Sequence, residues 1–235
     1  MDSSLCVPEN DRLKAVIFDL DGVILDSMPA HVASWRAAFG EVGLDIEEDV
    51  FYRHEGNLEW ETLRPFLAPR RPDLGPEVFS RLLERQREIY NHRYAAGVRV
   101  YPEAAGLLKD LRRDGLDLAL VTSSAWKVLA PWLREFLELY FDLVITRDQV
   151  KHGKPSPEPY LAALDRLGLG ADQALAVENA PAGIRSAKAA GLWCVALTTT
   201  LPPDLLAQAD LILDDQVALS RWLKNGRLKR APDGG

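Results

Sequence analysis

The feature that most constrains this chain is a short apolar run, ending at a polar residue, that occurs six times. These runs cover residues 14–19, 116–121, 141–145, 174–177, 193–197 and 211–213. A continuous apolar run of this length is typical of a strand buried on both faces of a parallel sheet. Helical patterns over 103–113, 125–136, 157–167 and 182–190 separate the runs. This alternation predicts an α/β fold, a Rossmann-like doubly wound parallel sheet covered by helices on both faces.

One interval breaks the alternation. Between residues 27 and 98 no strand pattern occurs, and amphipathic stretches cover 29–42, 57–67 and 76–94. We therefore expect two domains. Residues 1–26 and 99–235 form the α/β core, and residues 27–98 form an α-helical domain inserted after the first strand.

Charge and cysteine content exclude several classes of function. The net charge is −7 and no long basic run occurs, which argues against a nucleic-acid or membrane partner. Cys6 and Cys194 are the only cysteines, and without CxxC spacing they indicate neither a disulfide framework nor a zinc site. The sequence shows no signal-peptide pattern and no apolar run long enough to span a bilayer. We expect a cytoplasmic protein, and a monomer, because no helix pattern has a large exposed apolar face.

Polar residues of distinctive type follow the expected strands. They are Asp19, Asp21, Thr122, Ser123, Glu178 and Asn179, with Lys154 in the loop after the third core strand. Ligands of open parallel sheets bind beyond the carboxyl ends of the strands. Carboxylates suit a hard cation, and hydroxyls with one ammonium suit phosphate oxygens, so the mixture indicates a phosphate site.

Each of these residues also has a simpler interpretation. The pair Asp19 and Asp21 could belong to a turn, Thr122 could cap a helix, and Lys154 could be a solvated loop residue. Glu178 and Asn179 could cap the helix that follows them. The order of the residues, all at strand ends, favours the phosphate site.

Four motifs identify a resemblance to a known family. They are Phe18-Asp-Leu-Asp-Gly-Val-Ile-Leu-Asp-Ser27, Val121-Thr-Ser-Ser124, Lys154-Pro-Ser-Pro-Glu-Pro-Tyr160 and Val177-Glu-Asn-Ala-Pro-Ala-Gly-Ile184. The chain resembles the haloacid dehalogenase superfamily over residues 13–223, in its branch of β-phosphoglucomutase-like and phosphoglycolate-phosphatase-like proteins. The inserted domain then resembles the helical cap that closes over the substrate in this family.

The resemblance implies a role for each motif residue. Asp19 would be the nucleophile that forms an aspartyl-phosphate, and Asp21 the general acid and base. Thr122 and Ser123 would bind the phosphoryl oxygens. Lys154 would hold both the phosphate and the nucleophile.

The implied cofactor is Mg²⁺, with Asp19, Asp21, Glu178 and Asn179 as its ligands or near neighbours. The family's usual fourth motif ends in Glu-Asp, whereas this chain has Glu178-Asn179. An amide oxygen can bind Mg²⁺ but brings no charge. We therefore expect weaker metal binding unless Glu178 takes the inner position.

The cap distinguishes two activities of the family. Mutase-like members resemble this chain at Asp26, His31 and Trp35, where a histidine orients the acid/base aspartate; His31 could equally be a structural residue at the hinge. A mutase also uses a cap arginine for a second phosphate. At that place this chain has Glu59, with Glu55 nearby, although Arg53 or Arg64 could substitute.

Three hypotheses follow. The first is a Mg²⁺-dependent phosphatase for a small phosphorylated metabolite, such as a sugar phosphate or phosphoglycolate. The second is a β-phosphoglucomutase-like hexose-phosphate mutase. The third, suggested only by Asn179, is a non-catalytic protein that binds a phosphorylated ligand.

Overall fold

Six strands form one parallel sheet in the computed structural model, which describes residues 13–55 and 60–227. The order is β5-β4-β1-β6-β7-β8. The strands are β1 (Ala15–Phe18), β4 (Asp117–Val121), β5 (Leu143–Ile145), β6 (Ala174–Glu178), β7 (Trp193–Leu197) and β8 (Leu211–Leu213). Each corresponds to one of the six apolar runs, so the predicted α/β fold is confirmed. Among the described residues, no helix combines the length and apolar character needed to cross a bilayer.

Strand side chains alternate between two cores, one on each face of the sheet. Val16 and Phe18 of β1 belong to a core completed by α5 (Pro102–Arg113), α6 (Pro131–Tyr140) and α9 (Gln216–Arg227). Ala15 and Ile17 belong to a second core completed by α7 (Glu158–Leu167) and α8 (Pro181–Ala189). Burial on both faces explains why these strands are apolar throughout.

The order of the strands brings the motif residues together. β1 lies between β4 and β6, and Phe18 is in register with both Leu120 and Val177. The carboxyl ends of these three strands therefore reach the same edge of the sheet. The chain continues from β1 to β4 and β5 on one side and then crosses to β6, β7 and β8 on the other, so the strand order reverses at β1 and this edge is the expected ligand-binding crevice of the fold.

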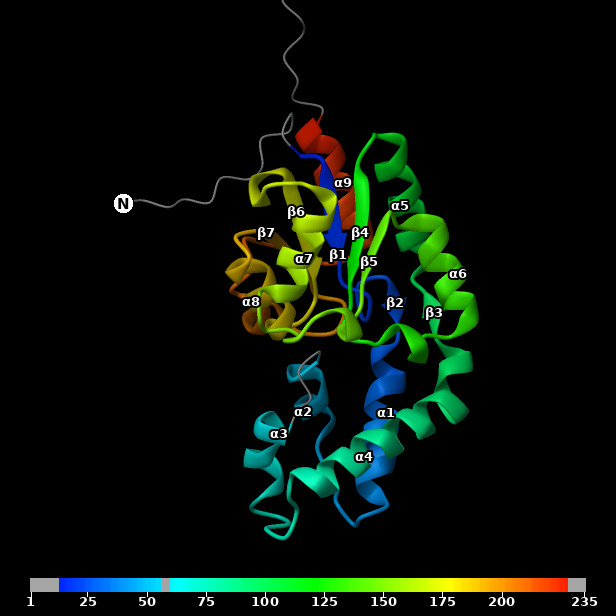
Figure 1. Ribbon diagram of the computed structural model, residues 1–235, viewed down its shortest axis with the longest axis vertical. Coiled ribbons are helices and arrows are strands. Elements are labelled where there is room, and N and C mark those ends of the chain that lie inside the picture. The colour runs from blue at the N-terminus through cyan, green and yellow to red at the C-terminus, as the bar shows by residue number, and fades with distance from the viewer. Residues whose placement is uncertain (1–12, 56–59, 228–235) are drawn as a thin grey trace, which may run out of the picture.

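A separate group of helices lies beyond that edge (Figure 1). It contains α1 (Met28–Gly40), α2 (Glu48–Arg53), α3 (Trp60–Leu67) and α4 (Pro76–Ile89). These helices share a third apolar core around Trp35, Phe39 and Phe51. Within the described part of residues 27–98 every element is helical. The domain limits themselves stay a prediction, and the first residues of the stretch 57–67 lie outside the described residues, as does Cys6.

Two very short strands join the helical group to the sheet. β2 (Leu25–Asp26) pairs antiparallel with β3 (Arg99–Val100). The hydrophobic pattern did not predict them, because two residues are too few to show a period. The six-residue helix α2 was missed for the same reason.

The predicted helix over 125–136 is wrong at its start. Residues Trp126–Val128 form a 3₁₀ turn, and the α-helix begins at Pro131. Proline forces the preceding residue out of the helical region, and Ala130 is accordingly extended, with ψ at 147°. The predicted stretch 76–94 is likewise divided, because α4 ends at Ile89 and Tyr90–Tyr94 forms a π-helical turn.

Short helical turns complete the chain. They are Ala95–Gly97, Arg147–Gln149, Ala171–Gln173 and Pro203–Leu206. Gly168 follows the last residue of α7 with a φ of 68°, a conformation that favours glycine. The helical pattern predicted over 157–167 ends at the residue before this glycine.

Candidate active site

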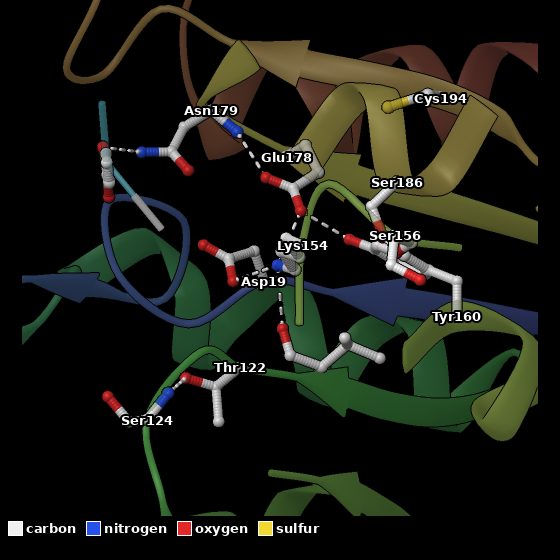
Figure 2. Close-up of polar contacts among 12 residues, drawn as sticks. Asp19, Thr122, Ser124, Lys154, Ser156, Tyr160, Glu178, Asn179, Ser186 and Cys194 are labelled. Carbon is white, nitrogen blue, oxygen red and sulfur yellow. Dashed lines mark hydrogen bonds and ion pairs between the residues drawn. The ribbon is translucent and has the colours of Figure 1, made fainter. Parts of the chain in front are cut away.

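Lys154 joins two carboxylates at the sheet edge. Its Nζ lies 2.6 Å from Oδ1 of Asp19 and 2.7 Å from Oε1 of Glu178. It also donates to the backbone carbonyl of Val121, at 3.1 Å. All three charged groups are buried. Figure 2 shows Lys154 between Asp19 and Glu178, so the structure assembles three residues that are 24 to 159 positions apart in the sequence.

Glu178 is fixed by further contacts. Tyr160 donates its hydroxyl proton to Oε1 of Glu178 at 2.6 Å, and the backbone N–H of Asn179 donates to Oε2 at 3.3 Å. Gly183 on α8 leaves room for this carboxylate, since a Cβ there would lie 2.0 Å from Oε1. Tyr160 ends the third sequence motif, but nothing in the sequence assigned it to the site. The packing of α7 against α8 brings it there.

Burial and neighbouring charges shift the pKa values of this cluster. Burial raises the pKa of Asp19 to about 7; Lys154 opposes this rise, while Glu178 and Asp21 add to it. Burial opposes the charge on Lys154, but the carboxylates of Asp19 and Glu178 hold its pKa above the ordinary value. Lys154 is therefore a permanent cation, and the charge state of Asp19 depends on what else lies in the site.

Asp21 lies beside the nucleophile candidate and faces the helical group. Ser27 donates to its Oδ1 at 2.5 Å, and Nε2 of His31 lies 3.4 Å from the same oxygen. The ring of His31 stacks on Tyr90, with 4.3 Å between centroids. Although burial opposes it, His31 and Ser27 lower the pKa of Asp21. His31 therefore lies next to Asp21, which is compatible with both of the roles that the sequence left open, while the sequence assigned no role to Ser27 or Tyr90.

The helical group contributes a carboxylate that the sequence did not place in the site. Oε2 of Glu55 accepts a hydrogen bond of 3.0 Å from Nδ2 of Asn179, which also donates to Thr200 at 2.9 Å. Glu55 is buried, and burial, followed by the charge of Asp19, raises its pKa well above the ordinary value. In the sequence Glu55 was only part of an acidic loop, and no local pattern connects it to residue 179.

Asn179 has a fixed orientation. Both contacts of its amide nitrogen, to Glu55 and to Thr200, leave the amide oxygen on the side of the site where Asp19 lies (Figure 2). A side chain at Gly22, whose φ is 79°, would come within 2.0 Å of that nitrogen. Among the described residues, the buried polar side-chain atoms without a hydrogen bond are Oδ1 of Asn179 and Oε1 of Glu55.

The hydroxyl residues of the second motif follow β4. Thr122 is buried, and its Oγ1 accepts a hydrogen bond of 3.1 Å from the backbone N–H of Ser124. Ser123 and Ser124 line the same cavity as Asp19. The loop therefore borders the same cavity as the carboxylate of Asp19.

A cavity of about 530 Å³ lies between these motifs and the helical group. Asp19, Asp21 and Lys154 form part of its lining, and His31 and Trp35 of α1 line it from the other side. The volume is within the ordinary range for small-molecule sites. Of the predicted site residues, Asp19, Asp21, Ser123, Lys154, Glu178 and His31 line this cavity, and Thr122 and Asn179 contact residues that do.

The donor set is compatible with Mg²⁺. No group of three His, Cys, Asp or Glu side chains in the described part of the chain is arranged to hold a metal ion. The remaining donors are nevertheless hard oxygens, the Asp19 carboxylate and the unpartnered amide oxygen of Asn179, to which the family resemblance adds the backbone carbonyl of Asp21. Because Mg²⁺ keeps several waters, two or three such protein oxygens suffice.

Comparisons with known proteins agree with this geometry. A family model described as haloacid dehalogenase-like hydrolase matches residues 13–191. Hexitol phosphatase A of Escherichia coli (strain K12) is 33% identical over 203 residues, which cover 86% of this chain and 91% of that protein. Phosphoglycolate phosphatase 1 of Pseudomonas aeruginosa is 34% identical over 191 residues, which cover 79% of this chain and 69% of that protein.

A solved structure from Bacteroides vulgatus has the same fold. It is described as a proposed β-phosphoglucomutase and is 32% identical to this chain, with a TM-score of 0.80. The match covers 93% of this chain and 91% of that one. Phosphatases and a mutase-like protein therefore both occur among its relatives.

Proposed function

Because the chain belongs to the haloacid dehalogenase-like hydrolase family, we propose that it is a Mg²⁺-dependent phosphatase acting on a small phosphorylated metabolite. Sugar phosphates and phosphoglycolate are the substrate types that the names of its relatives support. The observation that carries the proposal is the Asp19 carboxylate at the end of β1, buried against Lys154 and lining the cavity.

Asp19 is positioned for nucleophilic attack. Lys154 binds its Oδ1, so Oδ2 is the oxygen that forms a bond to phosphorus. As that bond forms, the bond between phosphorus and the ester oxygen breaks. The negative charge of the bound phosphate opposes the lowering of the Asp21 pKa by His31 and Ser27, so that Asp21 takes up a proton as the substrate binds and gives it to the departing oxygen. Asp21 then takes a proton from water, which attacks the aspartyl-phosphate and releases inorganic phosphate while Asp19 is restored.

The remaining residues bind and orient. Lys154 neutralises Asp19 and the phosphate, and Glu178 with Tyr160 holds Lys154 in place. Thr122 and Ser123 bind the phosphoryl oxygens. His31 and Ser27 orient Asp21 through its Oδ1. When bound, Mg²⁺ reduces the repulsion between the Asp19 carboxylate and the phosphate dianion. Asp19, the Asp21 carbonyl and Asn179 would hold it, with Glu178 nearby.

A hexose-phosphate mutase is the alternative, favoured by the contact of His31 with Asp21 and by the similarity to the Bacteroides vulgatus protein. The two arginines that could replace the missing cap arginine do not favour it. Arg53 pairs with Asp49 and Arg64 with Glu61, both at exposed positions, and neither lines the cavity. Glu59 lies outside the described residues.

A panel of phosphorylated metabolites tests the proposal. With Mg²⁺ present, at least one sugar phosphate or phosphoglycolate should release inorganic phosphate at a rate that falls to background in EDTA. Product analysis by NMR distinguishes the mutase, which would convert a hexose 1-phosphate into the 6-phosphate with little phosphate release. If no substrate gives either product above background, the enzyme proposal is wrong and the ligand-binding hypothesis gains support.

The pairing of Asn179 with Glu55 gives a prediction about metal binding. Asn179→Asp should tighten Mg²⁺ binding several-fold, measured by calorimetry, because it adds a charge at the unpartnered oxygen. It should also lower the Tm of the metal-free protein, because two buried carboxylates would then lie about 3.0 Å apart.

Glu55→Gln is the matched change on the other side of the pair. Combined with Asn179→Asp, it should restore the Tm of the metal-free protein, because one of the two charges is removed. An unchanged Mg²⁺ affinity in Asn179→Asp would show that residue 179 does not bind the metal.

A further inference from the structure

Glu55 is a buried carboxyl group that the proposed chemistry does not use. Only 5% of it is exposed, and it lines the cavity together with Asp19 and Asp21. Its Oε2 accepts a hydrogen bond of 3.0 Å from Nδ2 of Asn179 and a longer one of 3.5 Å from the hydroxyl of Thr200. Its Oε1 is buried and has no hydrogen-bond partner among the described residues. A buried oxygen without a partner is costly unless a ligand binds it.

The buried oxygens without partners occur as a pair. In the part of the chain that the structure describes, they are Oε1 of Glu55 and Oδ1 of Asn179. Their side chains already contact each other through the other polar atom of each group, at 3.0 Å. The amide oxygen of Asn179 also lies on the side of the site where Asp19 is (Figure 2). Two hard oxygens on touching side chains, close to a third, match the preference of Mg²⁺ for oxygen ligands.

The charge around this pair is unbalanced. Burial is the main cause that raises the pKa of Glu55, and three neighbouring carboxylates add to it: Asp19, Asp21 and Glu178. Lys154 pairs with Asp19 and Glu178, and its single charge cannot balance both of them. A divalent cation beside Glu55 would offset the remaining repulsion.

The departure in the fourth motif gives the pair a role. The family's usual motif ends in Glu-Asp, whereas residue 179 of this chain is an asparagine. An aspartate there would place a second carboxylate oxygen where the amide nitrogen now lies, 3.0 Å from Oε2 of Glu55. The asparagine avoids this repulsion and donates a hydrogen bond instead. The charge that is missing at the end of β6 is therefore present on the helical group.

We propose that Glu55 supplies the acidic metal ligand that the fourth motif lacks, so that Mg²⁺ is held by Asp19 and Asn179 of the core together with Oε1 of Glu55. The proposal rests on the Mg²⁺ site of the proposed function and adds to it a ligand from the helical group. A ligand stabilises the arrangement that binds it best. Binding of Mg²⁺ should therefore stabilise the contact between the helical group and the core.

Calorimetric titration with Mg²⁺, without substrate, tests the ligand. Glu55→Gln removes the charge but keeps a side-chain oxygen that can accept from Asn179 and Thr200. Its Mg²⁺ affinity should fall at least about tenfold. Glu61→Gln is the control, because Glu61 is an exposed residue of the helical group that does not line the cavity. It changes the net charge equally and should alter the affinity less than about twofold. An equal loss in both variants, or none in Glu55→Gln, would overturn the proposal.

Moving the charge between the two positions is a sharper test. The double variant Glu55→Gln/Asn179→Asp transfers the carboxylate from the helical group to the end of β6. Its Mg²⁺ affinity should recover to near the wild-type value, while that of Glu55→Gln alone stays low. A double variant that binds Mg²⁺ as weakly as Glu55→Gln would show that the loss does not come from a missing charge, and the proposed ligand would be wrong.

Hydrogen exchange measures the link to the helical group. The helix α2 ends two residues before Glu55. Saturating Mg²⁺ should slow amide exchange in α2 of the wild type several-fold. It should have no such effect in the double variant, because the metal is then held by the core alone. Equal slowing in both proteins, or none in the wild type, would contradict a ligand from the helical group.

These measurements keep the two proposals separate, because none of them needs a substrate. If the metabolite panel gives no phosphate release but Glu55→Gln still loses Mg²⁺ affinity, the phosphatase proposal fails and the ligand is supported. If the panel releases phosphate but Glu55→Gln binds Mg²⁺ as the wild type does, the ligand alone is overturned.

Discussion

Replacing Asp19 with asparagine should lower the rate of phosphate release at least about a thousandfold. The amide keeps the size of the side chain but cannot form an aspartyl-phosphate. The loss should be in kcat, because Lys154 and the hydroxyl motif that bind the phosphate are unchanged. Single-turnover assays on the best substrate of the panel measure it.

Two further measurements make this result specific. The Asp19→Asn variant should retain its far-ultraviolet circular dichroism and still bind inorganic phosphate with Mg²⁺. Acid quenching of the wild type during turnover should trap a phosphorylated protein, and peptide mapping should place the phosphate on Asp19. A variant with more than a tenth of wild-type kcat would exclude Asp19 as the nucleophile.

Replacing Lys154 with methionine should produce the largest loss of stability in the site, about 3 kcal/mol at neutral pH. Methionine keeps the apolar stem but leaves Asp19 and Glu178 buried without their shared cation. Denaturant unfolding without metal measures the change. Phosphate release should fall by orders of magnitude as well, because the positive charge beside the nucleophile is lost.

The loss of stability should depend on pH in a defined direction. Burial already raises the pKa of Asp19 to about 7, and removing Lys154 removes the charge that opposes this rise. A carboxyl group with a raised pKa in the folded protein favours folding while it is protonated, and this contribution is lost as pH rises through that pKa. The deficit of Lys154→Met should therefore be greatest above about pH 8 and shrink toward pH 5.

An exposed ion pair supplies the control for this prediction. Lys224 lies 2.7 Å from Asp110, and both side chains are partly exposed. Lys224→Met should change stability little at any pH. If Lys154→Met were equally mild, the three buried charges would not form the interdependent cluster that the distances indicate.

The sequence predicted the sheet and its motif residues well because both depend on local signals. Strands buried on both faces are continuous apolar runs, and the residues after them reach one edge of the sheet. The contact of Lys154 with Asp19 followed from the family resemblance rather than from any spacing, and its contact with Glu178 was not predicted. The prediction failed where a proline controlled the backbone, as at Pro131, and where elements were too short to show a period.

Contacts between residues far apart in the sequence could not be predicted. Glu55 of the helical group reaches Asn179 of the core across 124 positions, and within the helical group Tyr90 stacks on His31. An acidic residue in a loop and a tyrosine on a helix are ordinary in a sequence. Only the folded arrangement distinguishes Glu55, which is buried at the cavity, from Glu61, which is exposed elsewhere on the helical group.

The pairing of β2 with β3 has a consequence for how such proteins diversify. Leu25 lies opposite Val100 and Asp26 opposite Arg99, so the chain leaves and re-enters the sheet domain at neighbouring positions. The entropic cost of holding the two ends of a segment together rises only slowly with the length of the segment. Insertions, deletions or wholesale exchange of the intervening residues can therefore leave the nucleophile undisturbed. Recombination at this junction could give one reaction centre a new set of substrates in a single genetic event.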